Sequence, residues 1–134
     1  MPMITIKGKE YAYDENEVVN FAEGLVGLPG MRRAVVIPMA EFEPFCWLAS
    51  VEDETNRFIV VNPHEIFAGY QSAAPAGSSA EDLKTLAIVK ISSEWQKTTV
   101  NLRAPIVIDT ATRRGTQFVL TESAYSLTEP ISHD

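Results

Sequence analysis

The sequence is poor in the residues that build disulfides and metal sites. It contains 1 cysteine and 2 histidines among 134 residues. A single cysteine excludes an internal disulfide, and Cys46 lies in the apolar segment Pro-Phe-Cys-Trp-Leu, so we expect a buried, reduced thiol. His64 and His133 are far from Cys46 and from each other, without the spacing of a metal-ligand motif. The sequence therefore predicts no metal and gives no sign of a cofactor.

Long hydrophobic runs are also missing. No stretch approaches the roughly 18 consecutive apolar residues of a membrane span, and the first residues lack the charged head and apolar run of a signal peptide. We therefore expect a cytoplasmic protein with no membrane contact. The composition, 46% hydrophobic and 22% charged, is typical of a folded protein, and the length predicts one domain over residues 1–134.

Basic residues are scarce. The chain has 11 Lys and Arg against 18 Asp and Glu, a net charge of −7. The imbalance is concentrated between Glu10 and Asp82, where thirteen acidic residues face only three basic ones. A surface of this sign repels phosphate backbones, which argues against direct nucleic-acid binding and favours a basic protein partner.

Helical periodicity is absent, because no window of about 11 residues repeats apolar positions every 3.6 residues. Short segments rich in Val, Ile, Thr and aromatics predict an all-β fold, a compact antiparallel β-barrel-like single domain with only short helical turns at 16–20 and 63–67. Lys7-Gly8-Lys9 predicts a tight hairpin, and Ala111 to Gly115 a longer one with positive φ at Gly115. The nine predicted strands are 3–7, 10–13, 34–37, 45–50, 57–61, 85–91, 98–102, 106–110 and 116–120.

The predicted interior bears on whether the barrel holds a small molecule. We expect Trp47, Phe45 and Phe58 in the core, and bulky side chains filling the barrel. A small-molecule-binding β-barrel or a cryptic enzyme is the alternative to a protein-binding role, and it would need a cavity with converging polar groups. The residues expected to face inward are Leu86, Ile88, Val100, Leu102, Ile106 and Ile108.

Catalytic motifs are weak. Cys46, His64 and Asp53 offer the residue types of a nucleophilic triad, but no local nucleophile or oxyanion-hole signature accompanies them. His64 follows Asn62-Pro63, which favours a surface or capping role. Glycines at 24, 27 and 30 lack the strand, helix and Lys-Ser/Thr of a phosphate loop and indicate a turn. We therefore expect no enzyme.

Three segments resemble one protein family. They are Phe-Ala-Glu-Gly-Leu-Val-Gly-Leu-Pro-Gly at 21–30, Pro-Phe-Cys-Trp-Leu-Ala-Ser-Val-Glu-Asp at 44–53 leading into Phe-Ile-Val-Val-Asn-Pro at 58–63, and Val-Asn-Leu-Arg-Ala-Pro-Ile-Val-Ile-Asp at 100–109 continuing to Thr-Arg-Arg-Gly-Thr-Gln at 112–117. In this order, over about residues 4 to 130, they resemble the flagellar assembly factor (FliW) family.

The resemblance implies a β-barrel-like protein that acts by stoichiometric binding. Members of this family bind flagellin in the cytoplasm. In competition, they bind the carbon storage regulator CsrA, a small basic RNA-binding repressor of flagellin translation. When flagellin is secreted, the freed factor sequesters the repressor and translation resumes.

Candidate contacts follow from this implied role. The acidic turn Glu52, Asp53 and Glu54 is the first choice for attracting the basic repressor, with Glu41 and Glu43 second. Phe42 and Phe67 lie at predicted strand ends, where each is either part of the core edge or a candidate for a groove that accepts an amphipathic flagellin helix. Arg113-Arg114-Gly115 is either a solvated turn or a contact for phosphate or carboxylate.

Overall fold

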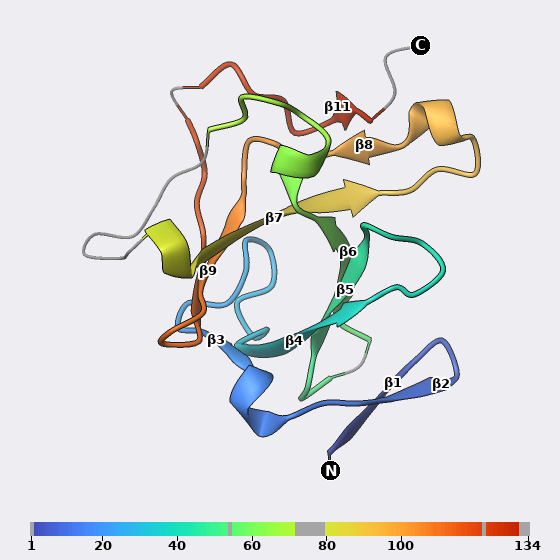
Figure 1. Ribbon diagram of the computed structural model, residues 1–134, viewed down its shortest axis with the longest axis vertical. Helices are drawn as coiled ribbons and strands as arrows, with labels where there is room; N and C mark the ends of the chain where they lie inside the picture. Colours follow the sequence, from blue (N-terminus) through green and yellow to red (C-terminus); the bar gives the residue numbers. More distant parts are fainter. Residues whose placement is uncertain (1, 54, 72–79, 122, 132–134) are drawn as a thin grey trace.

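The computed structural model describes residues 2–53, 55–71, 80–121 and 123–131, and is built almost entirely from strands (Figure 1). The strands are β1 (Met3–Ile6), β2 (Lys9–Ala12), β3 (Val19–Phe21), β4 (Arg33–Pro38), β5 (Cys46–Ser50), β6 (Arg57–Val61), β7 (Leu83–Lys90), β8 (Thr99–Val100), β9 (Ile106–Asp109), β10 (Arg114–Gln117) and β11 (Glu129–Pro130). The short 3₁₀ turns are η1 (Glu15–Glu17), η2 (Pro63–Glu65), η3 (Ala80–Asp82) and η4 (Trp95–Lys97). None of the described helices has the length and apolar character needed to cross a bilayer.

Seven strands close into a barrel. The order β7-β6-β5-β4-β3-β10-β9 returns to its start because β9 also pairs with β7. β8 and β11 extend from the edge of β7, and β1 pairs only with β2 (Figure 1). The predicted all-β barrel is confirmed. Its pairings among the described strands are antiparallel except for β3 with β10, which run parallel.

The barrel interior is packed with apolar side chains from alternating strand positions. Ala34 on β4, Leu48 on β5, Val60 on β6 and Leu86 on β7 all belong to the inner cluster. Four of the six residues predicted to face inward, Leu86, Ile88, Ile106 and Ile108, lie in or against this cluster. Bulky side chains therefore occupy the centre of the barrel.

Two further clusters cover the outside of the barrel. Val35, Ile37 and Ala49 on β4 and β5 pack beneath Ile4 and Ile6 of the β1–β2 hairpin. The second outer cluster lies over β6 and β7 and contains Val61, Ala87, Val89 and the buried rings of Phe45 and Tyr70. Because β6 is covered on both faces, its sequence from Phe58 to Val61 is a continuous apolar run.

The prediction was wrong for two of the inward-facing residues. Val100 and Leu102 are buried in the outer cluster over β6 and β7, not in the barrel. Val100 lies on β8, which pairs with β7 beyond the point where β9 joins, and so stands outside the closed ring. Alternation alone cannot tell which of two apolar faces a strand presents.

The seam between β3 and β10 was not predicted. β3 is a strand of only three residues, and β10 begins two residues before the predicted 116–120. The positive φ expected at Gly115 lies instead at Arg113, where φ is 57°. Gly115 is required for another reason, since the Phe21 ring fills the space that a side chain there would need.

Local turns agree with the sequence. Lys7 and Gly8 have φ of 51° and 79°, the pair of positive values that a two-residue hairpin loop of type I′ requires. η2 lies within the predicted turn at 63–67, whereas η1 begins one residue before the predicted 16–20 and overlaps only its first two residues. Asp14 and Asn62 cap them by accepting hydrogen bonds from the backbone nitrogens of Asn16 and His64.

Three residues expected in the core are only half-buried. The Trp47 ring packs against the outer cluster beneath the β1–β2 hairpin, and the cations of Lys7 and Arg57 each lie 5.8 Å from its centroid. Phe58 and the Cys46 thiol pack against the inner cluster but keep part of their surface exposed. Partial burial raises the pKa of Cys46, with Lys84 opposing and Glu65 adding to the shift.

Candidate binding surface

The loop from β4 to β5 presents Phe42 to solvent. The backbone nitrogen of Met39 donates to the carbonyl of Phe45 at 3.0 Å, and that of Phe42 donates to the carbonyl of Met39 at 2.9 Å. The nitrogen of Phe45 donates back to the Phe42 carbonyl at 3.0 Å, and the Glu43–Pro44 peptide bond is cis. Phe42 is nevertheless 43% exposed, so the loop holds a large apolar side chain in an ordered, accessible position.

Phe42 belongs to an aromatic cluster with Phe45 and Trp95. Its ring centroid lies 5.4 Å from that of Phe45 and 6.4 Å from that of Trp95. Phe45 and Trp95 are 6.1 Å apart in an edge-to-face arrangement. Phe45 is buried, whereas Trp95, on η4, is 43% exposed. The aromatic cluster is therefore anchored in the outer core and open on one side, as is typical of protein-binding surfaces.

Acidic side chains border the aromatic cluster. Glu41 and Glu43 are exposed on either side of Phe42, and the exposed Glu94 precedes Trp95. Glu94 also forms an ion pair with Lys97 at 2.8 Å. An apolar centre with a charged rim is the usual organisation of a protein–protein contact, and the acidic rim favours a partner segment with basic residues.

Phe42 and Phe67 line different pockets. Phe42 borders one of about 470 Å³ beside the β1–β2 hairpin, together with Tyr11, Met39 and Trp47. Phe67 borders one of about 310 Å³ near Tyr70 and Tyr125. The structure therefore places the two phenylalanines at separate sites, although Phe67 packs against the same outer cluster that contains Phe45.

Tyr70 forms the buried wall of the Phe67 pocket. Its hydroxyl donates to the Leu102 carbonyl at 2.6 Å, and its ring centroid lies 4.7 Å from that of Tyr125. Burial, with a smaller effect of Tyr125, raises the pKa of Tyr70 to about 12. The neutral hydroxyl therefore serves as a structural donor.

The acidic turn joins β5 to β6. Glu52 and Asp53 are exposed, and Glu54 lies outside the described residues. The buried Ser50 hydroxyl accepts from the backbone nitrogens of both Glu52 and Asp53 at 3.1 Å. Asp53 accepts from the backbone nitrogen and hydroxyl of Thr55, which lowers the pKa of this carboxyl. Asp53 therefore shapes the turn, whereas the Glu52 side chain has no such contact in the described structure.

The acidic turn and the loop carrying Glu41, Phe42 and Glu43 lie at opposite ends of β5 (Figure 1). A strand of five residues is about 16 Å long. The two sets of predicted contacts are therefore separate surfaces.

The three residues considered as a nucleophilic triad are also apart. Cys46 and Asp53 lie toward opposite ends of β5, and His64 on η2 contacts Asn62 and the Tyr70 ring. This placement does not assemble Cys46, His64 and Asp53 as a triad.

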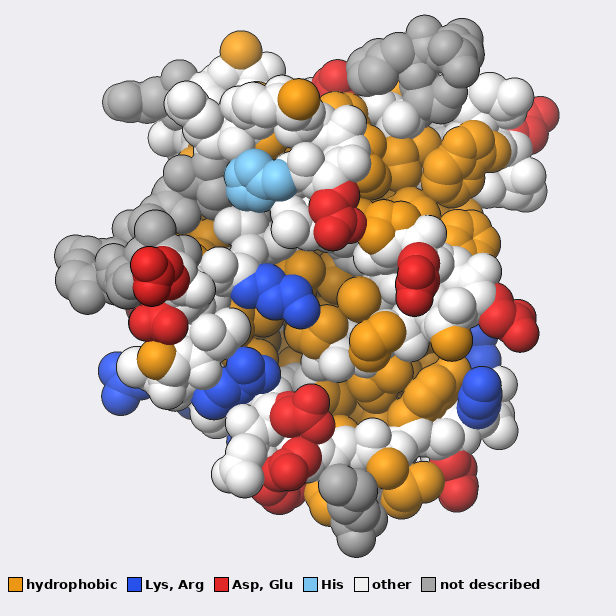
Figure 2. All heavy atoms as spheres, in the orientation of Figure 1, with side chains coloured by type: hydrophobic (Ala, Val, Ile, Leu, Met, Phe, Trp, Pro, Cys, Tyr) orange, Lys and Arg blue, Asp and Glu red, His pale blue; other side chains and the backbone are white. Residues whose placement is uncertain are grey.

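Hydrophobic side chains gather over the middle of the face seen in Figure 2, with acidic groups scattered around them. Within the described ranges, no cluster of His, Cys, Asp and Glu has the arrangement of a metal site.

Trp95 was not among the residues predicted from the sequence to bind a partner. Its signal was a large aromatic residue within the otherwise polar segment Ser-Ser-Glu-Trp-Gln-Lys.

Comparison with known proteins gives a consistent result. The model of the FliW protein family matches residues 3–131. The flagellar assembly factor FliW of Clostridium beijerinckii is 30% identical over 129 residues, which cover 91% of this chain and 92% of that protein. The protein of the same name from Bacillus licheniformis is 33% identical over 129 residues, covering 91% and 90%. A crystal structure of the flagellar assembly factor FliW has the same fold, with a TM-score of 0.90, 24% identity and 99% of both chains covered.

Proposed function

This chain belongs to the FliW family of flagellar assembly factors, and we propose that it works in the cytoplasm by binding flagellin and, when free of flagellin, the translational repressor CsrA. The role is stoichiometric and uses neither catalysis nor a cofactor. Flagellin translation then responds to the amount of flagellin that remains unsecreted. The observation that carries this proposal is the exposed aromatic cluster with its acidic rim.

Flagellin binding is assigned to the aromatic cluster. An amphipathic helix presents apolar residues every three or four positions, and such a stripe needs an apolar surface that is already ordered. Phe42 and Trp95 supply this surface, and the buried Phe45 fixes their positions. Phe67 lies in a separate pocket, and we assign it as a second contact for flagellin.

Repressor binding is assigned to the acidic residues. A net charge of −7 attracts a basic protein over a distance of about 10 Å at moderate salt. The acidic turn, with the sequence Glu52-Asp53-Glu54, is the first surface that we assign to the repressor. Glu41 and Glu43 are the second. The second surface adjoins Phe42, so a flagellin segment on the aromatic cluster would cover carboxylates that the repressor also uses. This overlap provides a physical basis for competition.

The proposal is tested by binding purified flagellin and purified CsrA to the immobilised full-length protein, separately and then in sequence. We expect each partner to bind alone and flagellin to release bound CsrA. An unrelated acidic protein of similar size serves as the control for non-specific capture of the basic repressor. Failure of both partners to bind would contradict the proposal, and simultaneous binding of both would contradict the overlap.

A further inference from the structure

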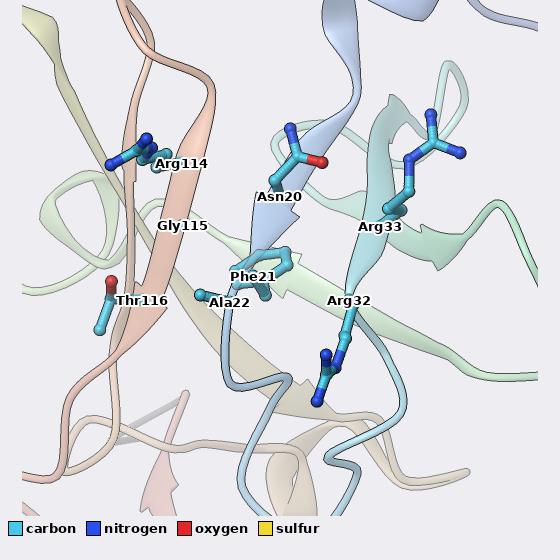
Figure 3. Close-up of a pocket in the computed structure, with 8 residues that line it drawn as sticks. All are labelled: Asn20, Phe21, Ala22, Arg32, Arg33, Arg114, Gly115 and Thr116. Atoms are coloured by element: carbon cyan, nitrogen blue, oxygen red, sulfur yellow. The ribbon is translucent and has the colours of Figure 1, made fainter.

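A basic groove crosses the outside of the barrel at the seam between β3 and β10 (Figure 3). Asn20 on β3 is the register partner of Arg33 on β4 and of Arg114 on β10. Val19 and Phe21 belong to the inner cluster, so Asn20 between them points outward, and its partners share that face. Two arginines therefore flank a short amide side chain, with strand spacing placing their backbones about 10 Å apart.

Small residues hollow the surface between these arginines. Gly115 places no side chain between them, and Ala22 adds only a methyl group. Arg32, the residue just before β4, borders the same groove, whose volume is about 610 Å³. In Figure 3 the three arginines surround Phe21 and Ala22 from different sides. A groove of this volume can accommodate a short extended peptide segment.

The guanidinium groups of the groove are only partly neutralised. Arg33 pairs with Glu15 at 2.9 Å, and Arg32 donates from Nε to the Pro29 carbonyl at 3.4 Å. The Arg114 side chain has no hydrogen bond or ion pair with any of the residues that the structure describes. The neighbouring Arg113 points elsewhere and donates to the Glu17 carbonyl. Asp109, the register partner of Arg114 on β9, accepts hydrogen bonds from the backbone nitrogens of Ala111 and Thr112. The residues that line the groove include three arginines and no acidic residue, on a protein whose net charge is −7.

We infer that this groove is a second protein-binding site, which binds the carboxylates of an acidic, extended segment of a partner. Arginine forks match carboxylate geometry, and the Asn20 amide between them can add a hydrogen bond. A nucleic acid fits less well, because binding a phosphate backbone takes many cations and this groove has only three arginines among its lining residues. This groove is distinct from the aromatic cluster and from the acidic turn. It binds acidic partner segments, whereas the acidic surfaces bind basic ones.

The direct test uses a short fluorescein-labelled peptide of alternating Glu and Ser, with a peptide of alternating Gln and Ser as its control. The Glu peptide should bind to the full-length protein and the Gln peptide should not. Arg114→Gln should weaken binding about tenfold, the effect of losing one charged hydrogen bond. Lys90→Gln is the matched control, because Lys90 is an exposed cation on β7 outside the groove. Equal affinity in Arg114→Gln and the wild type would overturn the inference.

A second variant should strengthen binding, a result that damage to the fold would not produce. Glu15→Gln removes the carboxylate that now occupies Arg33, so the Glu peptide should bind several-fold more tightly. Unchanged or weaker binding in Glu15→Gln, or tighter binding of a single-stranded RNA of equal charge than of the peptide, would reject the site. Flagellin and CsrA binding in Arg114→Gln should equal that of the wild type, which separates this inference from the proposed function.

Discussion

The ring of Phe21 lies in the space beside Gly115 that a β-carbon at this position would occupy. The two residues are register partners across the parallel seam of the barrel, and Phe21 is fully buried. The glycine thus allows the largest side chain of the inner cluster to lie against a neighbouring backbone. The seam depends on this contact.

We expect Gly115→Ala to destabilise the protein by about 1–3 kcal/mol, because the added methyl group must displace a fully packed ring. The free energy of unfolding in urea measures the effect. Gly30→Ala is the control, since nothing lies within 4 Å of the place that a β-carbon there would take, and it should change stability by less than about 1 kcal/mol. Equal stability of the two variants would contradict the packing at the seam.

Tyr70 predicts a loss of stability at alkaline pH. Its pKa is raised to about 12 in the folded state, whereas an unfolded tyrosine titrates near pH 10. The stabilising effect of the neutral hydroxyl is complete below about pH 10 and is lost as the pH rises toward about 12. Tyr70→Phe should lower stability at neutral pH by about 1 kcal/mol and flatten its decline between these values. An unchanged alkaline slope in urea unfolding would show that another group causes the decline.

Phe42→Ser and Trp95→Ser should each weaken flagellin binding about tenfold or more without unfolding the protein, because both side chains are exposed anchors of the aromatic cluster. Calorimetric titration measures the affinity. Val26→Ser is the matched control, since Val26 is 65% exposed in the loop between β3 and β4, outside the cluster. Phe67→Ser tests the second pocket separately. Wild-type affinity in both cluster variants would remove the aromatic cluster from the flagellin site.

The acidic turn should control how fast CsrA associates. Glu52→Gln removes one charge without changing a described hydrogen bond, so association should slow and depend less on salt, while dissociation changes little. Asp53→Ala would also lose the contacts with Thr55, and Asp53→Asn is the better variant because the amide oxygen can still accept them. Stopped-flow or surface-binding kinetics between about 50 and 500 mM salt measure both rates. Glu10→Gln removes a charge from β2 and is the control. If the association rate does not depend on salt and does not change in either variant, the acidic turn contributes only to solubility.

The sequence predicted the elements whose pattern is local. The strands predicted over 34–37, 45–50 and 57–61 follow from β-branched and aromatic residues, and the Lys7–Gly8 hairpin from its turn chemistry. β3 and β11 were missed because a strand of two or three residues is too short to show alternation, and β11 includes a proline. Their place is fixed by partners distant in sequence.

The candidate sites were predicted only in part, for the same reason. Phe42 could be predicted as a contact because it is an aromatic residue between two glutamates. Its contact with Trp95 depends on how the β4–β5 and β7–β8 loops meet. The row of Arg33, Asn20 and Arg114 likewise exists only after three strands align. Neither alignment leaves a signal in a single sequence.

The parallel seam also constrains when the barrel can form. The backbone nitrogen and the side-chain amide of Asn20 both donate to the carbonyl of Arg113. The two residues are 93 positions apart in the sequence. At typical translation rates of about 5–20 residues per second, β3 emerges from the ribosome several seconds before the strand that completes it. During that interval Val19 and Phe21 lack their enclosure, and β3 has one open edge. The barrel can therefore close only after most of the chain has been synthesised, and contacts between residues so distant in sequence also slow folding.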